Sequence, residues 1–84
     1  VILAGDLNEP PTGACWDRLR AAGFVDGGER GECTFPSHDP AERTDALLVR
    51  GNVNISEHGV PPLQPELLRM ASDHLPVVAT ISWP

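Results

Sequence analysis

The first eight residues, Val1 to Asn8, constrain the fold more than any other part of the chain. They begin with four consecutive apolar residues, a pattern that predicts a strand buried on both faces. Gly5 interrupts the apolar run, and the Pro10-Pro11 pair ends the strand because proline has no N–H to donate to a neighbouring strand. We therefore expect a buried strand at the start of the chain, followed directly by a turn.

Two polar residues, Asp6 and Asn8, follow the apolar run at a spacing of two. In an extended chain residues i and i+2 point to the same side, so the carboxylate and the carboxamide should leave the strand together at its C-terminal end. Open α/β folds usually bind ligands at this end of their strands. The alternative is that Asp6 and Asn8 only shape the turn, and the residues by themselves leave both interpretations open.

The length of 84 residues allows at most one small domain with a modest core. Because the sequence starts inside an apolar strand, whereas domain termini are usually polar and exposed, we expect a piece of a longer chain. Cys15 and Cys33 lack the spacing of a metal site and are too few for a disulfide framework, so two buried or half-buried thiols are expected. The sequence contains no run that resembles a signal peptide or a membrane span.

The charge of the chain bears on its partners. The formal net charge is −6, and the six basic residues are all arginine. An acidic balance disfavours broad nucleic-acid binding, which needs a basic surface, although nucleic acid is not excluded. It is compatible with a phosphate ester that a metal ion holds.

Spacing and turn residues predict the remaining elements. We expect a helix over 13–22 with Thr12 as its N-cap and Gly23 just after its end, and a polar surface loop over 26–32. Strands are expected over 43–50, 53–57 and 75–81, and a single helical turn over 65–70. His38 and His58 are expected at the surface, and Trp83 over the sheet edge; the alternative for His38 is a contact to a substrate or a metal. The expected core residues are Leu3, Leu19, Phe24, Leu48, Val77 and Ala79.

Three further polar residues lie near the starts of later strands: Asp45 in one, and the neighbours Asp73 and His74 in another. If these strands run antiparallel to the first, they meet Asp6 and Asn8 at one edge of the sheet. Such a group is costly to bury without a purpose. It could hold a divalent cation and orient a water, or present a histidine whose second ring nitrogen is held by an acid.

Four short motifs follow one another along the chain: Gly5-Asp6-Leu7-Asn8, Thr34-Phe35-Pro36, Arg43-Thr44-Asp45-Ala46-Leu47-Leu48 and Ser72-Asp73-His74-Leu75-Pro76-Val77. Together they resemble the C-terminal part of the endonuclease/exonuclease/phosphatase superfamily, and the resemblance covers essentially the whole chain. It implies an α/β fold, the C-terminal half of a two-sheet DNase I-like sandwich, with mostly antiparallel strands and one clear helix. Residues 1–84 would then be a partial domain whose N-terminal half is absent.

The resemblance implies hydrolysis of phosphate esters with Mg²⁺ or Mn²⁺. By this analogy, Asp6 would orient and deprotonate the attacking water, and Asn8 would donate to a phosphoryl oxygen. His74 would contact the phosphoryl group, and Asp45 would hold its imidazole. Asp73 would lie by the metal, as would Asp6. Phosphoryl transfer depends mainly on positioning and charge neutralisation, which suits these residue types.

Two departures from the family pattern limit the expectation. Ala46 stands where the family often has an aromatic residue. The family's main metal ligands, an Asn and a Glu, come from its N-terminal half, so we expect these 84 residues alone to be inactive or nearly so. The alternative is a non-catalytic interaction or structural module with remnant motifs. The substrate stays open among DNA, RNA, nucleotides, inositol phosphates and phospholipid head groups, as does the compartment.

Overall fold

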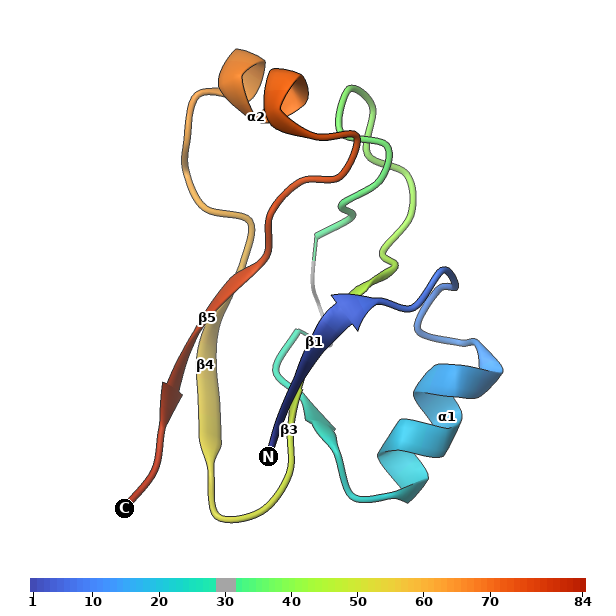
Figure 1. Cartoon of the computed structure of the whole chain (residues 1–84), viewed down its shortest axis with the longest axis vertical. Helices are drawn as coiled ribbons and strands as arrows, with labels where there is room; N and C mark the ends of the chain where they lie inside the picture. The colour runs from blue at the N-terminus through green and yellow to red at the C-terminus, as the bar shows by residue number, and fades with distance from the viewer. Residues whose placement is uncertain (29–31) are drawn as a thin grey trace.

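The computed structural model describes residues 1–28 and 32–84. This part of the chain is a small α/β protein with two antiparallel sheets and two helices (Figure 1). The strands pair in the orders β1-β3-β2 and β4-β5. The elements are β1 (Ile2–Asp6), α1 (Ala14–Ala21), β2 (Val25–Asp26), β3 (Asp45–Val49), β4 (Asn54–Gly59), α2 (Pro65–Ala71) and β5 (Val78–Ser82).

The strand pair β1–β3 gives the three-stranded sheet two different faces. Its antiparallel register places Leu3 opposite Leu48 and Asp6 opposite Asp45. Because side chains alternate along a strand, Leu3, Ala46 and Leu48 belong to one face, and the two aspartates belong to the other. The first face is apolar and packs against α1, so the carboxylates lie on the face away from the helix.

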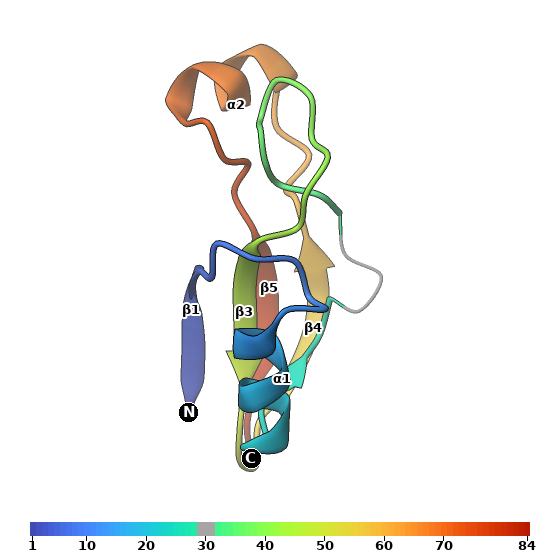
Figure 2. The ribbon, with the colours of Figure 1, turned by 90° about the vertical axis from the view of Figure 1, so that its right-hand side faces the viewer.

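Helix α1 covers the apolar face of this sheet and forms the core with it (Figure 2). Trp16 is completely buried and contacts a cluster that includes Ala46 and Leu48. Of the expected core residues, Leu48 is buried and Leu3, Leu19 and Phe24 pack against the cluster, whereas Val77 and Ala79 are only half-buried.

The expectation that the first strand is buried on both faces is wrong. Ile2 is 54% exposed, and only Leu3 within β1 is partly buried. The reason is that β1 is an edge strand of its sheet, paired with β3 alone, and α1 covers one face only. The apolar run therefore predicted the strand correctly, but it did not predict which faces of the strand are covered by other elements.

The start of α1 differs from the expected cap. The N-cap residue is Gly13 rather than Thr12, and no side chain at that position bonds to the helix. Instead the Glu9 carboxylate accepts hydrogen bonds from the backbone N–H groups of Cys15 (2.5 Å) and Trp16 (3.2 Å). A negative charge at a helix N-terminus is favourable, so Glu9 takes the place of the usual cap from four residues upstream. The end of the helix is as expected, because Gly23 has a φ of +91°.

The second sheet consists of β4 and β5, which pair from Asn54 opposite Ser82 to Gly59 opposite Val78. The chain between them contains α2, a two-turn helix with a proline at its start, where the sequence predicted a single turn. Trp83 is 67% exposed, so it does not cover the sheet edge as expected. No helix within residues 1–28 and 32–84 has the length and apolar character needed to cross a membrane.

A buried ion pair joins Asp26 in β2 to Arg43, and Asp26 lies in a region where a polar surface loop was expected. Arg43 donates two hydrogen bonds to the Asp26 carboxylate, at 2.9 and 2.7 Å, and both side chains are buried. The Gly28 N–H also donates to Asp26 at 2.9 Å. The surface expectation is therefore wrong for Asp26 and Gly28; positions 29–31 of the expected loop lie outside the described residues.

His58 lies against this ion pair and is half-buried rather than at the surface as expected. A methyl group on Gly28 would collide with its ring and with the Arg43 guanidinium, so these groups pack closely. Neither His58 ring nitrogen has a hydrogen-bond partner among the residues that the structure describes. Burial and the nearby Arg43 charge lower the pKa of His58, so the neutral imidazole is favoured there.

Candidate functional site

The candidate site begins with two carboxylates that face each other across β1 and β3. Asp6 and Asp45 are direct partners in the antiparallel register. Directly opposite residues in such a pair have Cβ atoms about 4.5–5.5 Å apart, and like charges at this distance repel. An ionised pair in this arrangement therefore needs a compensating positive charge.

His74 supplies a group that can provide this charge. Its Nδ1 atom lies 2.8 Å from Asp45 Oδ2, and its Nε2 atom lies 3.5 Å from Asp6 Oδ2. Each of the three residues offers one atom, and these atoms lie within 4.8 Å of one another. The residues come from β1, from β3 and from the segment between α2 and β5, so the fold brings together positions that are far apart in sequence.

The electrostatic surroundings favour the protonated imidazole. The hydrogen bond with Asp45 raises the pKa of His74, and the negative charges of Asp45, Asp6 and Asp73 raise it further; partial burial opposes them. A protonated His74 donates from Nδ1 to Asp45 and presents the Nε2 N–H toward Asp6. When His74 is protonated, the arrangement therefore holds one transferable proton between two carboxylates.

This arrangement predicts that Asp45→Asn lowers the pKa of His74 toward its ordinary value. The substitution removes the carboxylate that accepts the Nδ1 hydrogen bond, which is the largest cause of the raised pKa. The stabilisation from a raised histidine pKa is complete below the unfolded value of 6.5 and is lost as the pH rises through the folded value. The variant should therefore show a weaker loss of stability above pH 6.5 than the parent.

The measurement is an NMR titration of the His74 ring in metal-free buffer, with urea unfolding at several pH values. Asp39→Asn is the matched control, because it removes the same charge from an exposed loop position. A His74 pKa that stays unchanged in Asp45→Asn would contradict the assigned pairing.

Asp6 uses its two oxygens differently. Oδ1 accepts a hydrogen bond from the Asn8 N–H at 2.8 Å, which closes a turn over two residues, while Oδ2 faces His74. Asn8 has a φ of +55°, a left-handed conformation that asparagine tolerates better than most residues. The Asp6 carboxylate thus shapes the turn as one interpretation of the Asp6 and Asn8 spacing has it and also faces the imidazole, while the interpretation as a ligand-binding strand end stays a prediction.

The segment Thr34–Ser37 contacts the His74 ring and the backbone that precedes it. The Phe35 ring lies against the His74 ring, with centroids 4.7 Å apart. The Ser37 N–H donates to the Asp73 carbonyl at 2.7 Å, and its hydroxyl donates to the Ser72 carbonyl at 2.7 Å. The imidazole is therefore held in place by contacts to its ring and to the backbone that carries it.

The structure places the five predicted site residues in different ways. Asp6, Asp45 and His74 come together in one cluster. Asn8 contacts the cluster through its backbone N–H to Asp6. Asp73 lies outside the three-residue group; its charge raises the pKa of His74, and its carbonyl oxygen accepts the Ser37 N–H.

These side chains alone do not fit a resident Mg²⁺ ion. Mg²⁺ takes six ligands, almost all of them oxygens, in a nearly ideal octahedron. Asp6 Oδ1 already accepts the Asn8 N–H, Asp45 Oδ2 already faces His74, and the imidazole nitrogens point at carboxylates. Among the described residues both oxygens of Asp6 and Oδ2 of Asp45 therefore have partners, which leaves Asp45 Oδ1 alone without one of these contacts, so a metal ion here would need further oxygen ligands.

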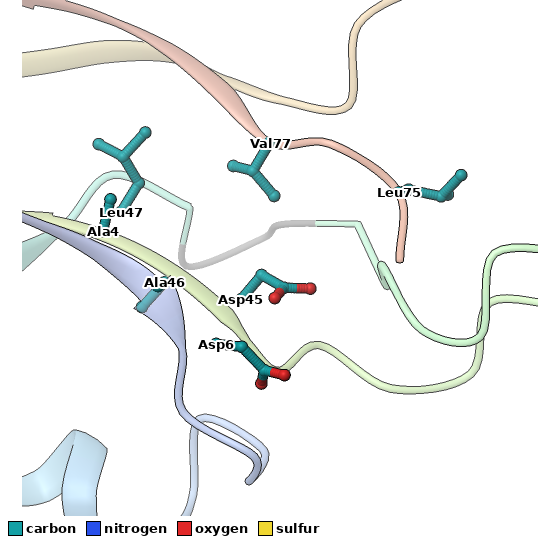
Figure 3. Close-up of a pocket in the computed structure, with 8 residues that line it drawn as sticks. Ala4, Asp6, Asp45, Ala46, Leu47, Leu75 and Val77 are labelled. Carbon is teal, nitrogen blue, oxygen red and sulfur yellow. The ribbon is translucent and has the colours of Figure 1, made fainter. Parts of the chain in front are cut away.

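A cavity of about 210 Å³ adjoins the carboxylates on the face of the sheet away from α1. Figure 3 shows Asp6 and Asp45 along one part of its wall and apolar side chains around the rest. Apolar walls reduce the competition from water and so strengthen the electrostatic contacts beside them. The lining residues are Ala4, Gly5, Asp6, Asp45, Ala46, Leu47, Leu75 and Val77.

The sequence interpretation assigned no role to Thr34, whose hydroxyl donates to Asp45 Oδ2 at 2.5 Å. The available signal was its position in Thr34-Phe35-Pro36, one of the four motifs on which the expected resemblance rests, but nothing in the spacing connects residue 34 with residue 45. Both cysteines are free thiols outside the cluster. Cys33 is half-buried as expected, whereas Cys15 is exposed, so the expectation is wrong for Cys15.

Comparisons with known proteins gave no relative: no family model, no curated protein and no solved structure matches this chain.

Proposed function

We propose that this chain is part of a metal-dependent phosphoesterase, that is, a nuclease or other phosphodiesterase, or a phosphatase. The chain would contribute Asp6, Asn8, Asp45 and His74 to the active site. The observation that supports the proposal best is the His74 imidazole between two carboxylates from separate segments. A carboxylate and a protonated histidine side by side are the base and the acid that ester hydrolysis requires. The four-motif resemblance to the superfamily points to the same chemistry.

In the proposed reaction, a water attacks the phosphorus atom and the bond from phosphorus to the ester oxygen breaks. Asp6 Oδ2, which lies 3.5 Å from His74 Nε2, takes a proton from the water, and the Nε2 N–H of His74 gives its proton to the leaving oxygen. Asp45 holds Nδ1 and stabilises the imidazolium before the transfer. Asn8 donates its carboxamide N–H to a phosphoryl oxygen. Positioning and charge neutralisation supply most of the rate in such reactions.

The proposal includes a divalent ion and a part of the domain outside these 84 residues. The DNase I-like sandwich that the resemblance implies has a second half, and that half would supply the oxygen ligands that the described residues lack. Asp6 and Asp73 are the candidates from this chain. When bound, Mg²⁺ or Mn²⁺ would neutralise charge on the phosphoryl oxygens.

The test is to assay the complete protein that contains this chain with bis(p-nitrophenyl) phosphate and p-nitrophenyl phosphate, with Mg²⁺ and with EDTA. We expect Mg²⁺-dependent hydrolysis of at least one ester, and little or none from the 84-residue piece. No hydrolysis by the complete protein would favour the non-catalytic module. Rapid Mg²⁺-dependent hydrolysis by the 84-residue piece would show that no further ligands are needed.

A further inference from the structure

Thr34 contacts the candidate site through its side chain and its backbone at once. Its side chain is buried, with 1% of the residue exposed, and its hydroxyl lies 2.5 Å from Asp45 Oδ2. Since an ionised carboxylate only accepts hydrogen bonds, the hydroxyl is the donor. The same oxygen faces His74 Nδ1 at 2.8 Å, so Thr34 and His74 share one acceptor atom.

The backbone of Thr34 connects the two segments that carry this pair. Its carbonyl oxygen accepts the Leu75 N–H at 2.7 Å, directly after His74 in the chain. Its N–H donates to the Glu42 carbonyl at 2.8 Å, three residues before Asp45. Thr34 thus fixes the spacing between the residue that carries the carboxylate and the residue that carries the imidazole.

The hydroxyl also restricts the carboxylate of Asp45. Rotation about the last side-chain bond of an aspartate is broad, so the backbone alone does not select which oxygen faces the imidazole. A second donor on Oδ2 narrows that rotation. Because the hydroxyl is buried, bulk water would not readily replace it as a donor to Asp45 Oδ2 if it were removed.

We infer that Thr34 is a positioning residue for the proposed hydrolysis: its hydroxyl orients the Asp45 carboxylate, and through it the His74 imidazole. The effect on rate rests on the proposed function, whereas the effect on the imidazole can be measured without any activity. A misplacement of about 1 Å in a catalytic group can reduce the rate by about 10²-fold.

The matched variants are Thr34→Val, Thr34→Ser and Thr44→Val in the complete protein. Valine keeps the shape of threonine and removes the hydroxyl, and serine keeps the hydroxyl. Thr44 is also buried and precedes Asp45 directly, but its hydroxyl has no partner among the described residues. Thr44→Val therefore controls for the loss of a buried hydroxyl as such.

We expect Thr34→Val to lower kcat by roughly 10- to 100-fold with little change in KM, because an oriented group is lost and substrate contacts are kept. Thr34→Ser should stay within about threefold of the parent, and Thr44→Val should behave as the parent. The ¹H signal of the His74 Hδ1 proton should lie far downfield in the parent and move upfield in Thr34→Val alone. Unchanged kcat and an unchanged Hδ1 signal in Thr34→Val would overturn the inference.

A measurement on the unsubstituted protein covers the case in which Thr34→Val does not fold. The Thr34 hydroxyl proton should exchange slowly with solvent and show a nuclear Overhauser effect to His74 Hδ1. Its absence, with His74 Hδ1 visible, would overturn the inference. If the complete protein hydrolyses no phosphate ester, the proposed function fails, while both NMR signals still decide whether Thr34 orients the pair.

Discussion

The His74→Ala substitution is expected to lower kcat for phosphate ester hydrolysis by about 10²- to 10⁴-fold in the complete protein, the range typical for loss of a general acid or base. The imidazole is the only group of the described cluster that bridges both carboxylates, through Nδ1 to Asp45 and Nε2 to Asp6. Its removal deletes the proton donor and leaves Asp6 and Asp45 facing each other without the compensating charge. The measurement is steady-state kinetics at saturating Mg²⁺.

The control is His38→Ala, which removes an imidazole from an exposed loop position. It should retain the activity of the parent. The assignment of His74 would be wrong if His74→Ala, shown by circular dichroism to be folded, kept more than about a tenth of the parent kcat.

The largest expected effect on stability comes from the buried ion pair. Asp26→Asn keeps the shape of the side chain but removes the charge that pairs with Arg43, which is also 5.1 Å from the centre of the Trp16 ring. Removing one partner of a buried pair typically costs about 3–5 kcal/mol, because the other charge stays buried without compensation. We expect a loss of about 3 kcal/mol in the free energy of unfolding, measured by urea denaturation near pH 7.

The pH dependence provides a second readout. Burial by itself would raise the pKa of Asp26, but the hydrogen bonds from Arg43 and the Gly28 N–H, with the Arg43 charge, outweigh it and lower the pKa below 3.8. The stabilisation from a lowered carboxyl pKa is complete above the unfolded value and is lost as the pH falls through the folded value. The parent should therefore lose stability below pH 3.8 more steeply than Asp26→Asn.

The exposed pair Asp17–Arg20, 3.6 Å apart on α1, is the matched comparison. Asp17→Asn removes the same charge at the surface, and exposed pairs contribute about 0–1 kcal/mol. Equal losses in Asp17→Asn and Asp26→Asn would argue that burial of the Asp26–Arg43 pair has no special effect on stability.

The parts of the fold that follow from local pattern could be predicted from the sequence. The helix after the Pro-Pro pair, its glycine end and the strands that became β1, β3, β4 and β5 agree with the structure within a few residues. The antiparallel pairing of β1 with β3 is confirmed, and it places Asp6 opposite Asp45 as the site required. That Asp6, Asp45 and His74 lie close together could be predicted because each of them stands next to an apolar strand pattern.

Contacts of polar residues that do not stand beside an apolar strand pattern could not be predicted. Asp26 stands in a glycine-rich stretch that has every mark of a surface loop, and only the fold reveals that Arg43 reaches it from 17 positions later. The contact between the Glu9 carboxylate and the N-terminus of α1 could not be predicted either, because Glu9 lies outside the helix. The exposure of Ile2 likewise depends on what covers β1, which its apolar sequence does not encode.

The register of β1 against β3 has a consequence for how the site forms. A shift of one residue would keep most ladder hydrogen bonds, yet it would place Gly5 or Leu7 opposite Asp45 and turn Asp6 toward α1. The two carboxylates would then lie on opposite faces, and His74 could bridge only one of them. Molecules that fold with the shifted register would therefore be inactive in any assay of the site. The active fraction of a preparation would then equal the fraction of molecules in which β1 and β3 pair in the observed register.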